Sequence, residues 1–140
     1  GNGGSAAIAS HCSVDFTKAA SIRAINFNES DLLTCFANDY GYENVFSNAV
    51  DFYADKNDVL ILISSSGESP NIINAARKAK ELGLSLITLS GFDEGNSLRK
   101  LGDINLWADS HGYNIVECVH QIWLLNICDF MIGSHYYAAN

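Results

Sequence analysis

The chain has 140 residues, of which 48% are hydrophobic and 17% are charged, and its formal net charge is −8. This length is typical of one domain with a core of its own, so we expect a single domain over residues 1–140. The acidic balance argues against nucleic-acid or anionic-membrane partners, because no basic stripe offsets phosphate repulsion. No stretch approaches the roughly 20 apolar residues that span a bilayer. With no secretory signal and no C-x-x-C pair among four cysteines, we expect reduced thiols in a cytoplasmic protein.

The first part of the chain alternates helical patterns with one short strand candidate. Ser5 can cap a helix that runs to about Lys18. Residues 22–27 predict a short strand, and a helix over 31–37 follows it. The segment Asn38-Asp39-Tyr40-Gly41 ends that helix, and an amphipathic helix is predicted over 43–54.

The second part contains the clearest strand signals. Residues 59–63 and 84–89 are continuous apolar runs bounded by turn signals, which is typical of strands buried on both faces. Between them, Ser69-Pro70 begins a helix that ends near Gly83. The remaining predicted elements are a short helix over 96–101, a strand over 104–108 and a long helix over 114–132. Alternating strands and helices indicate an α/β fold, a three-layer α/β/α sandwich with a mainly parallel sheet.

Two loops have the composition of anion sites. Gly1-Asn2-Gly3-Gly4-Ser5 opens the chain, and Ser64-Ser65-Ser66-Gly67-Glu68-Ser69 follows an apolar run. Each loop leads into a helix, so backbone N–H groups, hydroxyls and a helix N-terminus can face one anion. Neither loop is a Walker A motif or a dinucleotide fingerprint. We therefore expect a phosphorylated small molecule, a sugar before a nucleotide, and no nucleotide cofactor. The alternative for the second loop is a plain turn with Ser69 as a helix cap.

The opening glycine loop also bears on what precedes it. A phosphate loop of this kind ordinarily follows a strand, and a sheet without that central strand would expose its core on both sides. Either a helix and the first strand of the sheet lie upstream of Gly1, which we expect, or the sheet lacks this central strand.

Four segments in a fixed order carry a family resemblance. They are residues 1–5 with His11, residues 38–42 (Asn-Asp-Tyr-Gly-Tyr), the serine loop 64–69, and Gly112-Tyr113 with the helix that carries Glu117, His120 and Cys128-Asp129. Together they resemble the sugar isomerase (SIS) family, and within it the phosphoheptose isomerases. The resemblance implies a flavodoxin-like sheet, a homotetramer and a sugar-phosphate substrate. It also implies substrate contacts by Asn2, Gly3, Ser5, Asn38 and Asp39, and by Ser64, Ser65, Ser66 and Ser69. For Asp39 the alternative is a turn residue that ends a helix.

The sequence departs from this family where its chemistry is expected. The family's first helix carries His and, four residues later, Glu; here these positions hold His11 and Asp15. Its last helix carries Gln and, eight residues later, His, and the alignment places Glu117 and Leu125 there. In the family these four positions bind zinc and include the acid/base groups. The resemblance thus implies Asp15 and Glu117 as catalytic residues, with His120 a further candidate.

Spacing brings the polar candidates together in pairs. His11 and Asp15 are four residues apart, and Glu117 and His120 are three apart, so each pair shares a helix face. Imidazole and carboxylates suit one zinc or other divalent ion, with His11, Asp15 and Glu117 as ligands. The alternative is hydrogen-bonded polar pairs that line a cleft without metal. We expect His111 and His135 to be solvated, although His111 precedes Gly112, whose flexibility could let it approach the cleft.

The combined pattern predicts an aldose–ketose isomerase that acts on a phosphorylated sugar through an enediol. By resemblance the substrate is sedoheptulose 7-phosphate. The main alternative is a non-catalytic SIS module that binds a sugar phosphate, or a relative of the replication-initiator-binding members of this branch. A third possibility is a rearranged site that isomerises another sugar phosphate with His120 or His111.

Overall fold

Three parallel strands form one sheet in the computed structural model, which describes residues 1–136. The described strands are β1 (Val59–Ser64), β2 (Ser85–Ser90) and β3 (Ile104–Trp107), and they pair in the order β1-β2-β3. Ser64 lies beside Ser90, and Ser90 lies beside Trp107, so the carboxyl ends of all three strands meet at one edge. Ligands of open α/β sheets bind at this edge.

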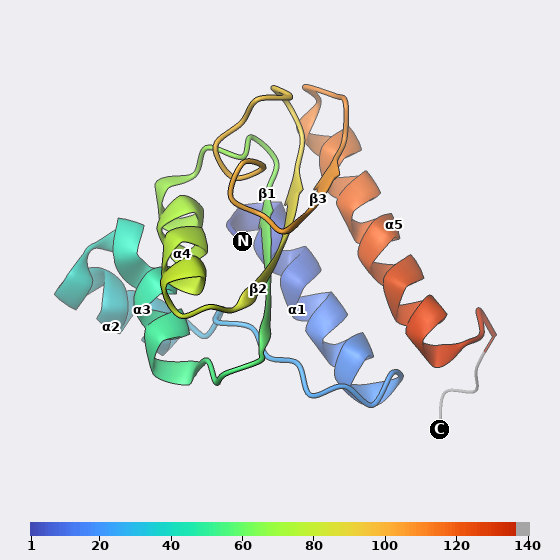
Figure 1. The fold of residues 1–140 in the computed structure, drawn as a ribbon, viewed down its shortest axis with the longest axis horizontal. Helices are drawn as coiled ribbons and strands as arrows, with labels where there is room; N and C mark the ends of the chain where they lie inside the picture. The colour runs from blue at the N-terminus through green and yellow to red at the C-terminus, as the bar shows by residue number, and fades with distance from the viewer. Residues whose placement is uncertain (137–140) are drawn as a thin grey trace.

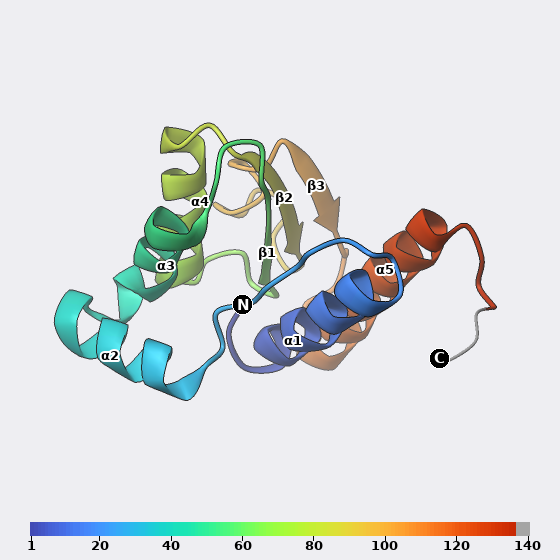
Figure 2. The same ribbon diagram turned by 90° about the horizontal axis from the view of Figure 1, so that it is seen from below.

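Helices cover both faces of the sheet (Figures 1 and 2). The helices α1 (Gly3–Lys18) and α5 (Tyr113–Ile132) lie on one face, side by side and running in the same direction. On the other face, α3 (Val45–Tyr53) packs against α4 (Pro70–Glu81), and α2 (Ser30–Tyr40) and the short helix η1 (Tyr42–Asn44) extend this layer outward. The predicted α/β/α sandwich with a parallel sheet is confirmed.

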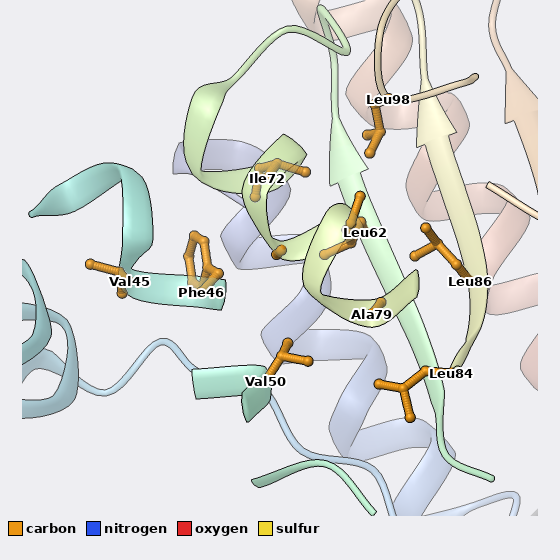
Figure 3. Packing of buried hydrophobic residues seen from close by; sticks show 11 residues of the cluster. Val45, Phe46, Val50, Leu62, Ile72, Ala79, Leu84, Leu86 and Leu98 are labelled. Carbon is orange, nitrogen blue, oxygen red and sulfur yellow. The ribbon is translucent and has the colours of Figure 1, made fainter. Parts of the chain in front are cut away.

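The alternation of side chains along the strands separates two cores. Leu62 and Leu86 face α3 and α4 and join an apolar cluster that includes Ile72 (Figure 3). Their neighbours Ile63 and Leu89 face α1 and α5 and join a second cluster. Because successive strand residues point to opposite faces, the continuous apolar runs of β1 and β2 fill both cores at once.

Two predicted elements are absent from the described part of the chain. The predicted strand over 22–27 has no regular secondary structure and belongs to no ladder, because no described strand lies beside it to pair with. The predicted helix over 96–101 is a series of turns. There the N–H groups of Ser97 and Leu98 donate to the Glu68 carboxylate and the Gly67 carbonyl, so the segment is bonded to the serine loop in place of an i→i−4 ladder.

The last helix, α5, is less buried than a central helix of this apolarity would be. Its length and mean hydropathy of 1.4 are those of a membrane-spanning segment, against the expectation that no stretch approaches one. Its inner face joins the second core through Leu124 and Cys128, while Ile115, Ile122 and Phe130 are exposed. Length and composition alone are weak grounds for a membrane span, because the cover helix of a sheet has the same features.

Candidate functional site

The serine loop 64–69 connects β1 to α4 and contains an unpartnered hydroxyl. The Ser64 and Ser69 hydroxyl groups lie 3.2 Å apart. The Ser69 carbonyl accepts the N–H groups of residues 72 and 73, so Ser69 begins α4 through its backbone and its hydroxyl does not cap the helix. Ser65 Oγ is buried and has no hydrogen-bond partner among residues 1–136. A buried hydroxyl without a partner is costly, so this atom points to a ligand.

Contacts to the turns after β2 fix the shape of the serine loop. The carboxylate of Glu68 accepts a 2.7 Å hydrogen bond from the backbone N–H of Ser97, so its charge is held by that neighbouring turn. Gly67 has φ +67° and lies so close to the Asn96 side chain that no Cβ fits between them. The Leu98 N–H donates to the Gly67 carbonyl, and Asn96 donates to Ser90 Oγ. The loop is therefore pre-organised by residues outside it.

The glycine loop is attached to α4 by a pair of amides. The side chains of Asn2 and Asn71 exchange two hydrogen bonds of 2.9 Å each, and Asn71 is buried. Tyr42 also donates its hydroxyl hydrogen to Asn2 Oδ1 at 3.0 Å. These bonds use much of the hydrogen-bonding capacity of the Asn2 side-chain amide, which thereby holds the glycine loop against the start of α4. The two anion-type loops are thereby held next to one another.

A pocket of about 280 Å³ opens between the two loops, and we call it the loop pocket. It brings together seven of the nine residues predicted to bind substrate: Asn2, Gly3, Ser5, Ser64, Ser65, Ser66 and Ser69. Tyr113 and Glu117 of α5 complete its wall. The Glu117 carboxylate packs directly over Gly4, where a Cβ would collide with it. The loop pocket thus combines hydroxyls, a helix N-terminus and one carboxylate.

A second pocket of about 660 Å³ lies further along α1 and α5, and we call it the helix pocket. His11 Nε2 and Asp15 Oδ2 are 3.0 Å apart at its rim, and Leu125 forms part of its wall. From the other side, His135 Nδ1 lies 3.1 Å from Asp129 Oδ2. All five residues line this one pocket, so it holds two imidazole–carboxylate pairs.

Three of the predicted site residues lie outside both pockets. His120 is fully buried, and its Nε2–H donates to the Ser90 carbonyl at 3.0 Å. Burial lowers the pKa of its imidazole, and the bond to the Ser90 carbonyl opposes that shift in part. Asn38 donates to its neighbour Asp39 at 2.8 Å at the exposed end of α2. This geometry favours a positioning role for His120, which ties α5 to the end of β2.

The residues predicted to bind a metal are divided between the two pockets. His11 and Asp15 line the helix pocket, whereas Glu117 lines the loop pocket. Over residues 1–136, no three His, Cys, Asp or Glu side chains are close enough together to hold a metal ion. As placed here, the donor set does not fit a zinc ion, and zinc binding stays a prediction.

Three residues that matter for this geometry were not selected from the sequence. Asn71 and Asn96 hold the two loops, and neither forms a motif that marks it in one sequence. His135 was expected to be solvated, and its side chain is indeed 71% exposed, but it lines the helix pocket. The available signal was Gly133, since a glycine after a long helix often takes a left-handed conformation and reverses the chain.

Comparison with known proteins gives one consistent family. The SIS domain model matches residues 1–91. A phosphoheptose isomerase from Helicobacter pylori (strain HPAG1) is 39% identical over 135 residues, which are 92% of this chain and 70% of that protein. The solved structure of phosphoheptose isomerase from Neisseria gonorrhoeae superposes with a TM-score of 0.87 at 34% identity, covering 94% of this chain and 73% of the other. A Francisella tularensis phosphoheptose isomerase structure gives a TM-score of 0.86 at 28% identity, covering 94% and 72%.

Proposed function

The chain belongs to the SIS domain family and, within it, to the phosphoheptose isomerases, and we propose that it interconverts sedoheptulose 7-phosphate and the corresponding aldose phosphate. The loop pocket would hold the phosphate and the helix pocket the reacting carbons. The single observation that carries this assignment is the placement of both pockets on the same pair of parallel helices.

The spacing of the pockets suits a sugar phosphate. Ser5 lines the loop pocket and His11 the helix pocket. Six residues of helix separate them, a rise of about 9 Å. That span is of the order of an extended six- or seven-carbon sugar. A phosphate held by the serine loop would therefore place the carbonyl end of the sugar near His11 and Asp15.

The anchoring and the chemistry fall to different residues in this proposal. Ser65 and Ser66, with Ser64 and Ser69, would donate hydroxyl hydrogen bonds to the phosphate at the start of α4. The His11–Asp15 pair would move a proton between the two reacting oxygens as the enediol forms and collapses. General acid–base help of this kind is worth about 10²–10⁴-fold in rate. Glu117 would contact the sugar near its phosphate end, and no step is derived through a metal.

A turnover assay with a panel of C6 and C7 sugar phosphates tests the proposal. We expect aldose product from sedoheptulose 7-phosphate, and loss of turnover in the His11→Gln/Asp15→Asn double variant. Calorimetry on the same double variant should show sugar-phosphate binding close to that of the wild type, because the loop pocket is intact. Binding of the panel without turnover by the wild type would instead favour the non-catalytic SIS module.

We also propose that the protein assembles as a homo-oligomer, with the family's tetramer as the expected form, in the cytoplasm. The outer sides of α1 and α5 expose Val14, Ile122 and Phe130, with exposed fractions of 60%, 56% and 85%. Exposed apolar side chains of this size favour burial against another subunit. Sedimentation velocity is the test. A clean monomer at micromolar concentration would contradict the assembly.

A further inference from the structure

The helix pocket contains a second group able to transfer protons, and this group is at none of the four positions that the family resemblance marks. Its wall has two imidazole–carboxylate pairs, His11 with Asp15 and His135 with Asp129. An aldose–ketose isomerisation moves two protons, one between neighbouring carbons and one between neighbouring oxygens. Two imidazoles that face the same cavity match that requirement. We propose that His135 is a catalytic base of this isomerase, an inference that rests on the proposed function.

The end of α5 explains how His135 reaches the pocket. Gly133 has φ +81°, and its N–H bonds to the carbonyls of Asp129 and Phe130, which ends the helix and reverses the chain. Two hydrogen bonds between Ser134 and Tyr136, of 2.8 and 3.0 Å, close the turn that follows. The reversal places the His135 ring over Asp129, one helical turn from Leu125 on α5.

The contact with Asp129 selects the tautomer of His135. Nδ1 lies 3.1 Å from a carboxylate oxygen, so Nδ1 carries the hydrogen and donates it. Nε2 is then left with a free lone pair, which is the form of a general base. His11 uses Nε2 for its own carboxylate and leaves Nδ1 free. Within residues 1–136, each ring therefore keeps one nitrogen without a hydrogen-bond partner, and this nitrogen can contact the substrate.

Carboxylates of both pairs act on the same buried thiol. Burial raises the pKa of Cys128, and the charges of Asp15 and Asp129 raise it further. Cys128 lines the helix pocket together with both carboxylates. Cys128 stays a neutral thiol there and does not compete with the imidazoles for a proton.

The proposed step balances without a further reactant. Nε2 of neutral His135 takes the proton from C1 of the ketose, and the C–H electron pair becomes the C1=C2 bond of the enediol. The C2 carbonyl oxygen takes a proton from protonated His11. His11 then recovers a proton from the C1 hydroxyl as the C1 carbonyl forms, and His135 returns its proton to C2. Both imidazoles end as they began.

The test compares His135→Ala with a matched variant, His111→Ala. His111 also pairs with an exposed aspartate, Asp93 at 3.4 Å, but lines neither described pocket. We expect His135→Ala to lower kcat about 10²–10⁴-fold with little change in KM, and His111→Ala to keep both. Because His135 is largely exposed, free imidazole in the buffer should restore part of the lost rate. Asp129→Asn should lower kcat less than His135→Ala does. It should also lower the rate of deuterium exchange at C1 in D₂O by the same factor as its own kcat.

Each result decides the proposal. Loss of kcat in His135→Ala with imidazole rescue supports His135 as the base. An active wild type with an equally active His135→Ala overturns it and leaves the isomerase function standing. A wild type that binds but does not convert any sugar phosphate overturns the isomerase, and this step with it. Circular dichroism checks that both alanine variants remain folded.

Discussion

The carboxylate of Glu117 on α5 lies against the Cα of Gly4 on α1, in the space that a side chain at residue 4 would occupy. This contact joins the two parallel helices at the wall of the loop pocket. Only a residue without a Cβ lets the carboxylate approach so closely. The contact with Glu117 therefore explains why residue 4 is glycine, and the Glu117 carboxylate can take this position only because Gly4 has no Cβ.

Gly4→Ala should separate stability from binding. Alanine favours the helix by up to about 1 kcal/mol over glycine, and the three atoms nearest to its Cβ belong to the flexible end of Glu117. We therefore expect an unchanged or higher melting temperature. The displaced carboxylate would move into the loop pocket and weaken inorganic phosphate binding by charge repulsion, which calorimetry would measure.

A second variant isolates the charge in that experiment. Gly4→Ala/Glu117→Gln carries the same crowding with a neutral amide, so it should recover most of the phosphate affinity. If the double variant binds no better than Gly4→Ala, the loss comes from a distorted loop and the charge argument is wrong.

Ser65→Ala should weaken phosphate binding without cost to the free protein. The Ser65 hydroxyl is buried and has no partner in the described part of the chain, so its removal breaks no bond there. A hydrogen bond to a charged acceptor is worth about 1.5–3 kcal/mol, which corresponds to a loss of roughly ten- to a hundredfold in affinity. Calorimetry with inorganic phosphate and thermal melts of the free protein measure the two effects.

Ser47→Ala is the matched control for that experiment. Ser47 is also buried, but its hydroxyl donates to the Asn44 carbonyl at 3.0 Å, far along the chain from both loops. We expect this variant to lower the melting temperature and to leave phosphate affinity unchanged. The reverse pattern in the two variants would place the phosphate elsewhere.

The sequence predicted the layers of the fold because local patterns carry them. Continuous apolar runs over 59–63 and 84–89 gave strands that are buried on both faces, and Ser69-Pro70 marked the start of α4. The segment 22–27 has strand composition, but a strand exists only where a neighbour pairs with it. Residues 96–101 have helical composition, but the N–H groups of Ser97 and Leu98 are bonded to Glu68 and Gly67 of the serine loop. Both differences come from partners distant in sequence.

The parts of the candidate site that depend on local sequence patterns were also predictable, and those that depend on how the helices pack were not. Loop composition identified Ser64, Ser65, Ser66 and Ser69, which the structure gathers in one pocket. Helical spacing placed His11 beside Asp15 correctly. It could not show that Glu117 lies at the other pocket, since that depends on how far α5 is shifted along α1. The inward rotation of α5 buries His120, and periodicity within one helix does not fix that rotation.

The stability of the protein should fall in acid through His120. Burial lowers the pKa of this imidazole in the folded state, so below the ordinary value near 6.5 the unfolded chain binds the proton more readily. Its contribution is full above that value and is lost as the pH falls toward the folded-state pKa. Urea unfolding between pH 7.5 and 5 should show this decline, and His120→Asn should show a flatter one. Equal slopes for both proteins would assign the acid sensitivity to other groups.

Leu125→His should restore activity to the His135→Ala variant. Leu125 lines the helix pocket one helical turn before Asp129, so an imidazole there faces the same cavity as the one removed. The replacement gives up partly buried apolar area next to the second core, so we expect a lower melting temperature as well. A tenfold or greater gain in kcat over His135→Ala would show that the cavity needs an imidazole on the α5 side.

Ile122→His in the same His135→Ala background is the control for this rescue. Ile122 is also on α5 but is 56% exposed and lines neither described pocket, so its imidazole faces solvent or another subunit. We expect no gain in kcat from it. A gain from both histidines would mean that the position of the added imidazole on α5 does not matter. A gain from neither would mean that the base needs a more exact position than a side chain on α5 can give. In that last case the turn after Gly133, which holds the ring of His135 against Asp129, supplies the geometry that the helix face cannot.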